Sequence, residues 1–441
     1  MHKRRISVIG LGPVGLVTAV SFAKQGYKVV GIDSDANRVD ALLRRQTPFF
    51  EPKLDAYLKD SIDSGMLSVS TDLDSTSDFV YVTVGTPCDK DGKINLEYVK
   101  KAASNIGRSL RDIKVHQVIV IKSTVIPGTA RTLVRPEIER ESGKSAGKDF
   151  GICSNPEFLR EGRAIEDAEY PDRIVIGSDE DASAQNLVDL YHEFHGSHTP
   201  TILRTTHENA ELIKYANNAF LATKISFINT IANIAERIPN ADVTIIAKGI
   251  GLDQRISPGF LNAGLGFGGS CFPKDVNALI NYCKVHGYIP QLLEATLEVN
   301  RLQALKVVEF ARKMLKPLNG RKIAILGLAF KPGTDDMREA VSIPIIESLI
   351  HEGAEISACD PAAVPNARKI FGQKIQYFSD PKDCLEKTDL AIVVTEWDEF
   401  RKLTSRDFIN SMNLPIIFDG RRIYGAEMRS QGITYGGVGI T

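Results

Sequence analysis

Residues 6 to 15 read Ile6-Ser7-Val8-Ile9-Gly10-Leu11-Gly12-Pro13-Val14-Gly15, an apolar run that leads into three closely spaced glycines. The G-x-G-x-x-G spacing predicts a buried parallel strand over residues 6–9, a tight turn, and a helix over residues 14–25. In such a unit Gly10 permits the turn, Gly12 lets the backbone approach a pyrophosphate, and Gly15 lets the helix pack closely on the strand. The segment therefore predicts a dinucleotide site whose phosphates sit at the helix N-terminus.

The residue that follows the second predicted strand indicates which dinucleotide is bound. Residues 28–32 lead to Asp33, an acid about 20 residues beyond the glycines. A carboxylate at this place accepts hydrogen bonds from the adenosine ribose and repels a 2′-phosphate, so NAD is favoured over NADP. The alternative for Asp33 is an ordinary turn residue at the end of a strand.

The same N-terminal stretch imitates a targeting signal, because residues 6–23 carry no charge and follow basic residues 3–5. The glycines and the proline inside the stretch weaken a helix there, which argues against a signal peptide or a membrane span. We find no later segment that suits a bilayer. We therefore expect a cytoplasmic protein that does not bind a membrane.

Composition excludes several classes of function. With 54 basic and 55 acidic residues the formal charge is −1, so bulk electrostatics does not draw the chain to nucleic acid or anionic membrane. The six cysteines form no Cys-x-x-Cys pair, which argues against a disulfide framework and against structural zinc, and suits a reducing compartment. A length of 441 residues suggests two or three domains.

The alternation of strands and helices continues through the first half of the chain. Residues 79–84 and 117–122 are predicted strands, and residues 96–110 are a predicted helix between them. Ligands of open α/β sheets collect at the carboxyl ends of strands, which is where Thr86 and Thr124 fall. Each threonine could line the nicotinamide half of the cofactor or could simply form a turn.

Two long segments without Gly or Pro, residues 209–237 and 292–315, predict long helices. Helices of this kind between α/β units suggest a connecting spine and a dimer interface. Strands then resume, so the predicted fold is α/β, with two Rossmann-like doubly wound parallel-sheet domains joined by a long-helix central region. The predicted boundaries are residues 1–203, 204–316 and 317–441.

The second α/β unit repeats the strand pattern but lacks the three-glycine turn, so we expect it to bind something other than a second dinucleotide. Lys331, Arg421 and Arg422 fall at strand ends, where they could hold a diphosphate or could be solvated loop charges. The strands of this unit are expected over residues 322–326, 355–359, 390–395 and 416–418.

A glycine-rich segment, residues 264–275, carries the strongest chemical signal. Four of its first six residues are glycine, and the flexible loop that they predict delivers Cys271 just ahead of Lys274 and Asp275. A cysteine near a cation is suited to be a low-pKa nucleophile, whereas a free cysteine is usually a small buried hydrophobe. Spacing alone leaves both interpretations of Cys271 open.

Two other segments are candidates to act with this loop. Residues 155–162 place Glu157 and Glu161 four positions apart beside a proline and a glycine, as in a binding loop. Lys214 and Asn218 are also four apart, on one face of the first long helix. A lysine on such an apolar helix is costly to bury unless it pairs or reacts.

Three histidines, His192, His195 and His198, are spaced three apart and invite a metal site. Gly196 lies among them and the next element begins at Pro200, so one helix face does not present all three. We therefore expect no metal.

Together these motifs resemble a known family. Residues 155–162, 210–218 and 266–275 follow the dinucleotide turn in the order found in nucleotide-sugar dehydrogenases, the UDP-glucose/GDP-mannose dehydrogenase family. A fourth motif, residues 330–338, lies in the corresponding place, and the resemblance covers nearly the whole chain. The motifs are more similar to the UDP-glucose branch than to the UDP-N-acetylhexosamine branch, while the GDP-mannose branch shares more of the first motif.

The resemblance implies an NAD-dependent four-electron oxidation of UDP-glucose to UDP-glucuronate, of use in polysaccharide biosynthesis, by at least a homodimer. In the implied reaction Cys271 forms a thiohemiacetal and then a thioester, while Lys214 and Asp275 assist removal of the alcohol proton. Glu157 activates water, and Thr124 positions it. Asn218 and Lys214 stabilise the oxyanion. The implied catalytic residues are Cys271, Lys214, Asn218, Asp275, Glu157 and Thr124.

The resemblance also implies two sets of contacts. The cofactor contacts are Gly10, Gly12, Val14, Gly15, Asp33, Arg38, Thr86, Thr124, Glu161, Lys274 and Arg338. The substrate contacts are Glu157, Phe158, Leu159, Arg160, Glu161, Lys214, Asn218, Phe260, Leu261, Asn262, Ala263, Gly264, Gly268, Lys331 and Arg421. Arg255 matches an arginine that in some members reaches the substrate of the neighbouring subunit.

Two other functions compete with this one. A two-electron hydroxy-acid dehydrogenase of the 6-phosphogluconate kind would rely on Lys214 and Asn218 and would treat Cys271 as packing, but it has no need of a second α/β unit. A regulatory protein that only binds NAD would show no turnover of any nucleotide sugar.

Overall fold

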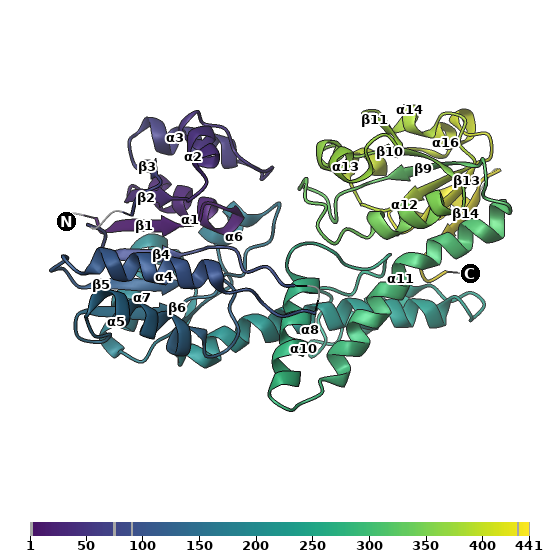
Figure 1. Cartoon of the computed structure of the whole chain (residues 1–441). Helices are drawn as coiled ribbons and strands as arrows, with labels where there is room; N and C mark the ends of the chain where they lie inside the picture. The colour runs from purple at the N-terminus through teal and green to yellow at the C-terminus, as the bar shows by residue number, and fades with distance from the viewer. Residues whose placement is uncertain (1–2, 74–75, 90, 430–431, 441) are drawn as a thin grey trace. The chain divides into compact units, whose positions relative to one another are not determined.

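The computed structural model describes residues 3–73, 76–89, 91–429 and 432–440, and the chain divides into two compact units (Figure 1). The first unit comprises residues 1–217 and the second comprises residues 218–441. Among the described residues, none of the helices combines the length and the apolar character needed to cross a bilayer.

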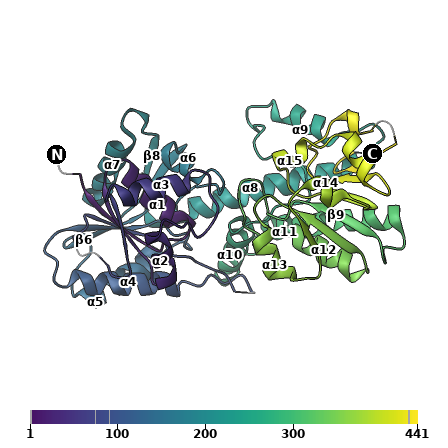
Figure 2. The ribbon, with the colours of Figure 1, turned by 90° about the horizontal axis from the view of Figure 1, so that it is seen from above.

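The first unit contains an eight-stranded sheet with the order β3-β2-β1-β4-β5-β6-β7-β8. Figure 2 shows α1, α3 and α7 on one face of this sheet and α4 and α5 on the other, and each face has its own apolar core. The strands are β1 (Arg5–Ile9), β2 (Lys28–Ile32), β3 (Leu67–Ser70), β4 (Phe79–Val82), β5 (Gln117–Ile121), β6 (Phe150–Ser154), β7 (Arg173–Gly177) and β8 (Thr201–Thr205). The α-helices are α1 (Pro13–Lys24), α2 (Ala36–Leu43), α3 (Leu54–Asp63), α4 (Glu97–Leu110), α5 (Arg135–Ser142), α6 (Ala164–Glu169) and α7 (Asp181–His195), with a π-helix over Ala130–Val134 and a 3₁₀ turn over Gly196–His198.

One strand reverses the otherwise parallel arrangement of this sheet. β7 pairs antiparallel with β6 at Ser154 and Gly177, and β8 is parallel to β7, so the predicted parallel sheet is parallel only as far as β6. The link between β6 and β7 contains only the six-residue helix α6. Because β7 runs antiparallel to β6 and pairs with it at the end of β6, the link does not have to cross the sheet. Residues 155–172 therefore stay near the carboxyl ends of the parallel strands.

The second unit contains a six-stranded sheet, parallel throughout, with the order β11-β10-β9-β12-β13-β14, and one apolar core. Its strands are β9 (Lys322–Leu326), β10 (Glu355–Cys359), β11 (Gln376–Phe378), β12 (Leu390–Val393), β13 (Ile416–Asp419) and β14 (Thr434–Gly437). Its helices are α9 (Val243–Gly251), α10 (Phe272–Val285), α11 (Gln291–Leu315), α12 (Ser342–His351), α13 (Val364–Phe371), α14 (Pro381–Leu385), α15 (Asp398–Arg401) and α16 (Ser405–Ser411), with a 3₁₀ turn over Ala426–Arg429.

The predicted elements are present, with small differences at their ends. The two long segments without Gly or Pro form α8 (His207–Ala235) and α11, and α8 contains the boundary between the two units. The strands predicted over residues 79–84 and 390–395 each run two residues too far, because the β-branched pattern continues beyond the last paired residue of β4 and β12. Both α/β units and the helical region between them are therefore present as predicted, except that the first sheet contains the reversal at β7.

Candidate active site

The glycine turn after β1 is shaped to receive a pyrophosphate. Gly10 has a φ of +95°, and Gly12 is the N-cap of α1, with Pro13 in the first turn of that helix. A Cβ on Gly15 would lie 1.8 Å from the carbonyl oxygen of Gly10, so only glycine fits there. A Cβ on Gly12 would meet no described atom within 4 Å, which leaves space in front of the unpaired N–H groups of α1. The turn therefore fits the phosphates of a dinucleotide.

Asp33, directly after β2, is buried and organises its surroundings. Its Oδ2 accepts a hydrogen bond from Leu11 N at 2.8 Å and lies 2.9 Å from Arg38 Nη1. Its Oδ1 accepts from Asp35 N at 3.0 Å. Asp33 is therefore a turn acceptor and also an orienting partner of Arg38, while its contact with a ribose stays a prediction.

Thr86 and Thr124 lie in the loops that follow β4 and β5, as predicted. The hydroxyl of Thr86 donates to the carbonyl oxygen of Thr124 at 2.8 Å and so joins the two loops. This bond supports the turn-forming interpretation for Thr86. Contact of either threonine with nicotinamide or with water stays a prediction.

The first buried ion pair of the site lies within the first unit. Lys214 Nζ is 2.9 Å from Glu157 Oε1, and the two side chains are 5% and 6% exposed. The other oxygen of Glu157 accepts from the backbone N–H of Leu159. Removing one member of such a pair would leave a buried group without its partner, so each side chain fixes the position of the other. The structure thus puts an ammonium and a carboxylate side by side, as proton transfer requires.

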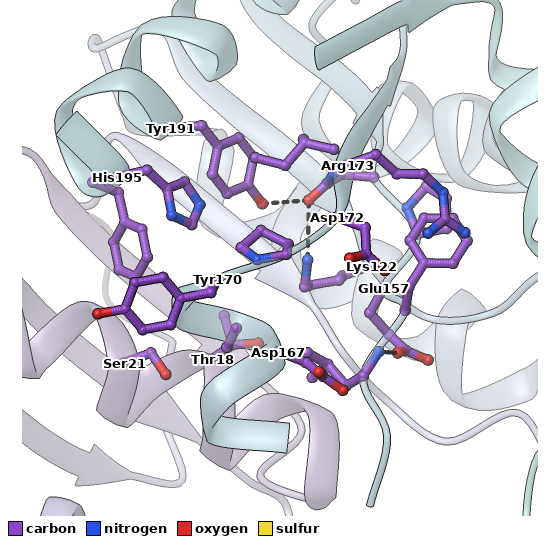
Figure 3. Close-up of a pocket in the computed structure, with 18 of the residues that line it drawn as sticks. Thr18, Ser21, Lys122, Glu157, Asp167, Tyr170, Asp172, Arg173, Tyr191 and His195 are labelled. Carbon is purple, nitrogen blue, oxygen red and sulfur yellow. Dashed lines mark hydrogen bonds between the residues drawn. The ribbon is translucent and has the colours of Figure 1, made fainter. Parts of the chain in front are cut away.

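A cavity of about 90 Å³ lies behind the segment that carries Glu157 (Figure 3). Lys122 Nζ donates to Asn155 Oδ1 at 3.1 Å, and the hydroxyl of Tyr191 donates to the same oxygen. Asn155 Nδ2 donates to the carbonyl oxygen of Val175 at 2.8 Å. These bonds fix the start of the segment, and the sequence had singled out neither Lys122 nor Tyr191.

The rest of this segment is tied to α6. The Nε of Arg160 lies 2.9 Å from Asp167 Oδ2, so the guanidinium predicted to contact substrate is paired within the protein. Glu51, a buried residue that the sequence did not single out, accepts from Gly162 N at 2.7 Å and from Ala164 N at 2.8 Å. These bonds close the N-terminus of α6 and hold the backbone on either side of it.

The candidate nucleophile lies in the second unit at the start of a helix. Cys271 is the N-cap of α10, and its Sγ lies 3.6 Å from the hydroxyl of Ser270. The backbone N–H of Asp275 donates to the carbonyl oxygen of Cys271 at 2.8 Å. A helix N-terminus favours a thiolate, because its unpaired N–H groups and its dipole stabilise negative charge.

The other cysteines differ from Cys271 in their surroundings. Burial raises the pKa of Cys153 and that of Cys359 to about 12, and burial also raises the pKa of Cys384 and Cys283. A thiol with a raised pKa is a poor nucleophile at neutral pH. These four cysteines fit the usual role of a free cysteine, that of a small apolar side chain in packing.

Asp275 forms a second cluster with residues predicted to act with it. Its Oδ2 accepts from Asn218 Nδ2 at 2.6 Å, its Oδ1 pairs with Lys274 Nζ, and the residue is 1% exposed. The second unit thus brings Asn218, Cys271, Lys274 and Asp275 together, while Glu157 and Lys214 form the pair of the first unit.

The glycine loop before Cys271 is held firmly, which corrects the expectation that it is flexible. Asn300 donates to the carbonyl oxygen of Phe267 at 2.9 Å and accepts from its N–H at 2.7 Å. Gly264 N donates to Asn229 Oδ1 at 2.8 Å, and Gln303 Nε2 donates to the carbonyl oxygen of Gly264 at 2.9 Å. Side chains of α8 and α11 therefore replace the regular backbone bonds that the loop lacks.

Gly268 and the residues before the loop have identifiable roles. A Cβ on Gly268 would lie 2.1 Å from the carbonyl oxygen of Glu339, so glycine lets the loop approach that segment. Phe260 has a φ of +64° at the start of the stretch, and Leu261 and Ala263 are buried in the core of the second unit. Asn262 lies between them, and contact of this stretch with substrate stays a prediction.

The predicted strand-end cations already have partners. Arg421 Nε donates to the carbonyl oxygen of Val394 at 2.6 Å, its Nη1 donates to that of Gly266 at 3.2 Å, and Arg422 lies 2.8 Å from Asp242. Further polar or ring contacts are those of Arg338 with Asp336, Arg255 with Asp253, and Lys331 with the ring of Phe330. Arg421 therefore supports the glycine loop, and its contact with a diphosphate stays a prediction.

The histidine series is not arranged as a metal site within the part of the chain that the structure describes. His195 Nδ1 lies 3.1 Å from the carbonyl oxygen of Glu169, and burial lowers the pKa of His195. His198 Nδ1 lies 3.3 Å from the hydroxyl of Ser197.

Comparison with known proteins connects this geometry to a family. Three family models match the chain in order: the NAD binding domain of the UDP-glucose/GDP-mannose dehydrogenase family over residues 4–195, its central domain over residues 208–302 and its UDP binding domain over residues 324–426. The chain belongs to this family.

Individual relatives agree with the family assignment. A UDP-glucose 6-dehydrogenase of Bacillus subtilis is 42% identical over 99% of this chain and 93% of its own length. One of Haloferax volcanii is 40% identical over 98% of this chain and 99% of its own length. The structure of a UDP-glucose dehydrogenase from Pyrobaculum islandicum, 37% identical, superposes with a TM-score of 0.92 and covers 100% of this chain and 98% of that one.

Membership in the UDP-glucose/GDP-mannose dehydrogenase family assigns the two α/β units. The chain is an NAD-dependent oxidoreductase that acts on a nucleotide sugar. The NAD binding domain contains the glycine turn and Asp33, and the residues present there fit the cofactor. The central domain contains Cys271, Asp275 and Asn218.

Proposed function

We propose that this dehydrogenase oxidises the C6 alcohol of UDP-glucose to the carboxylate of UDP-glucuronate, with two NAD and one water. The observation that carries the proposal is Cys271 at the N-terminus of α10, with the buried carboxylate of Asp275 one turn later. Relatives that are 42% and 40% identical bear the name UDP-glucose 6-dehydrogenase. Residues of the glycine turn would hold NAD, and each of two NAD molecules would supply the acceptor for one hydride; binding, orientation and proton transfer belong to the side chains of the protein.

In the first step the C6 alcohol is oxidised by two electrons to an aldehyde, and the chain's own residues take up the hydroxyl proton. We assign assistance in removing this proton, through water, to Lys214 and Asp275. The thiol of Cys271 then adds to the aldehyde, so the half-oxidised carbon stays bound. Loss of a second hydride and a proton from this thiohemiacetal gives the thioester.

In the last step water attacks the thioester carbonyl, the carbon–sulfur bond breaks and the thiolate of Cys271 leaves. Glu157 takes the proton of the attacking water, which Thr124 orients. Lys214 and Asn218 steady the oxyanion that develops. The buried Lys214–Glu157 pair and the Asn218–Asp275 bond support these roles, because each fixes a charged or polar group in advance.

We further propose the division into residues 1–203 for NAD, 204–316 for the spine and catalytic loop, and 317–441 for the UDP moiety. The three family matches fall inside these limits. The predicted substrate contacts of the glycine loop, Lys331 and Arg421 belong to this proposal, as do the cofactor contacts of Glu161, Lys274 and Arg338.

We propose that two copies associate through the helical region, which leaves large apolar side chains exposed. Side chains exposed by 51% to 78% occur on or next to α8 to α11 at Phe220, Phe227, Ile245, Leu252, Val285 and Leu292. Arg255, whose side chain is 89% exposed, is available to reach a neighbouring subunit. All six cysteines are free thiols, which supports a place in the reducing cytoplasm, where UDP-glucuronate supplies polysaccharide synthesis.

The test is NADH production on a panel of purified nucleotide sugars, with stoichiometry. We expect UDP-glucose to give two NADH per molecule consumed. A ratio of one would support a two-electron dehydrogenase, and preference for GDP-mannose or a UDP-N-acetylhexosamine would move the chain to another branch of the family. The six-stranded second sheet and its match to a UDP binding domain argue against the 6-phosphogluconate kind.

A further inference from the structure

Arg173, the first residue of β7, has no role in the reaction described above, yet it contacts the segment of Glu157. Its guanidinium carbon lies 3.8 Å from the centroid of the Phe158 ring, a distance at which the planar group stacks on the ring face. Its Nη2 donates to Asn217 Oδ1 at 2.7 Å. Within the described residues Arg173 forms no ion pair, so the ring and the amide are what hold this half-buried charge.

The Phe158 ring is near both Arg173 and Lys214. Lys214 Nζ is 5.4 Å from the same ring centroid and 2.9 Å from Glu157 Oε1. Asn217, the partner of Arg173, lies on α8 three residues after Lys214. Arg173 therefore connects the segment of Glu157 and Phe158 to Asn217 of α8. The same helix carries Lys214, the partner of Glu157.

The reversed strand explains why these side chains meet. β6 and β7 pair antiparallel at Ser154 and Gly177, the last residue of each strand, so Arg173 at the start of β7 lies beyond the end of β6, where the segment with Phe158 continues. In a parallel return the first residue of β7 would begin at the opposite edge of the sheet. The topology therefore delivers a guanidinium to the segment that carries Glu157.

The cavity behind this segment makes the contact with Arg173 more important. Residues 155–160 line the cavity, so on that side they lack the dispersion contacts that a filled core supplies. Figure 3 shows Arg173 and Glu157 on the same side of the cavity. Stacking by Arg173 therefore supplies restraint that packing does not.

We propose that Arg173 is a positioning residue. It holds the Phe158 ring and, through the adjoining backbone, keeps the Glu157 carboxylate beside Lys214. This inference rests on the proposed function, in which Glu157 takes the proton of the water that cleaves the thioester. Because the nucleophile and Asp275 belong to a different cluster, loss of Arg173 should slow thioester cleavage more than either hydride transfer.

The test compares Arg173→Met, which removes the charge and the plane, with Arg173→Lys, which keeps only the charge. The full-length enzyme is supplied with UDP-glucose and NAD, quenched during steady state, and weighed intact to measure the fraction held as acyl-enzyme. We expect kcat of Arg173→Met to fall about tenfold to a hundredfold, with KM changed less than about threefold and a larger acyl-enzyme fraction. Arg173→Lys should recover part of the loss, and added ethylguanidinium should partly rescue Arg173→Met.

Arg204→Met is the matched control, because Arg204 is an exposed arginine on the neighbouring strand β8 and pairs with Asp181 at 2.8 Å. We expect it to match wild type. Phe158→Leu removes the ring on which Arg173 stacks, so it should give the same acyl-enzyme build-up, and the double variant should be no worse than either single one. This second variant also tests the inference if Arg173→Met fails to fold.

The possible outcomes distinguish failure of this inference from failure of the proposed function. Wild-type enzyme that makes no NADH from UDP-glucose overturns the proposed function and this inference with it. Wild-type enzyme that makes two NADH, with kcat and acyl-enzyme unchanged in Arg173→Met, or in Phe158→Leu if Arg173→Met does not fold, overturns the inference alone. A loss confined to the first hydride transfer also overturns it.

Discussion

Asn218 donates a hydrogen bond of 2.6 Å to Asp275, so an amide of α8 fixes the carboxylate that lies one turn after Cys271. The bond joins two motifs that are 57 residues apart in the sequence. Lys274 pairs with the other carboxylate oxygen of Asp275, so both oxygens have partners. The residue is 1% exposed. A carboxylate fixed in this way needs no reorganisation when substrate arrives.

Asn218→Asp should convert this bond into a repulsion. Two carboxylates at hydrogen-bond distance cannot both ionise, so the pair retains a proton and loses it only at higher pH. We expect kcat to fall about a hundredfold near pH 8 and to recover partly as the pH is lowered, because the shared proton restores a donor. The measurement is kcat for NADH production across the pH range. Asn105→Asp, exposed on α4, should keep the wild-type profile, and the same profile in both variants would contradict the role of Asp275.

Cys271→Ser should remove the covalent step. A serine hydroxyl without an adjacent base is a poor nucleophile, so we expect turnover to fall by about 10⁴-fold or more. Quenched reactions weighed intact should show no thioester, and at most one NADH should form per active site before the reaction stalls. Cys283→Ser is the matched control on the same helix, because Cys283 is half-buried and burial raises its pKa. Normal turnover in Cys271→Ser would return this cysteine to a packing role.

The dinucleotide turn was predictable because its physics is local. The positive φ of Gly10 and the 1.8 Å approach at Gly15 both follow from residues that are close in the sequence, so the motif alone specified them. The same holds for Cys271 and Asp275, which share the first turn of α10. Sequence spacing was enough to predict the turn and to single out Cys271 and Asp275 as candidates, although the helix α10 that begins there was not predicted.

The supports of the site were not predictable in the same way. Arg173 meets Phe158 because β7 runs antiparallel to β6, and nothing in the spacing of residues 155–177 announces that reversal. Asn300 and Gln303 hold a loop that is more than 30 residues away in sequence, and amides on a helix are usually solvated. The loop was therefore expected to be flexible from its glycines, although long-range side chains fix it.

Glu211 should make the stability of the first unit depend on pH. It accepts from Gly128 N at 2.6 Å and from Ala130 N at 2.9 Å, yet burial raises its pKa from 4.5 to about 7. Because the folded-state pKa is the higher one, the protonated carboxyl stabilises the fold at low pH, and this contribution is lost as the pH rises from about 4.5 to 7. We expect the free energy of unfolding of Glu211→Gln, measured relative to that of wild type, to increase between about pH 5 and 8 by up to about 3 kcal/mol.

The measurement is the difference in thermal midpoint between variant and wild type at each pH. Glu208→Gln is the control, because its hydrogen bond with Arg131 lowers the pKa of Glu208 to about 2. The stability that the Glu208 carboxylate contributes is lost only as the pH falls through its lowered pKa. The difference in thermal midpoint between Glu208→Gln and wild type should therefore be constant between about pH 5 and 8. An equally constant difference for Glu211→Gln would contradict the prediction.

Gly268→Ala should disturb the catalytic loop directly. The added Cβ would lie 2.1 Å from the carbonyl oxygen of Glu339, a backbone atom that cannot turn away, so the loop must move. Since Gln303 holds the loop at Gly264 and Asn300 holds it at Phe267, just before Gly268, the displacement should be transmitted toward Cys271. We expect kcat/KM for UDP-glucose to fall about a hundredfold, as a misplacement of about 1 Å can cause, with NAD binding by the first unit retained.

Gly249→Ala is the control. Gly249 is an exposed helical glycine of α9, and no described atom lies within 4 Å of the new Cβ. We expect this variant to keep wild-type activity and to stabilise the fold by about 0.5–1 kcal/mol. Wild-type kcat/KM in Gly268→Ala would mean that the loop reaches its working position without this close approach.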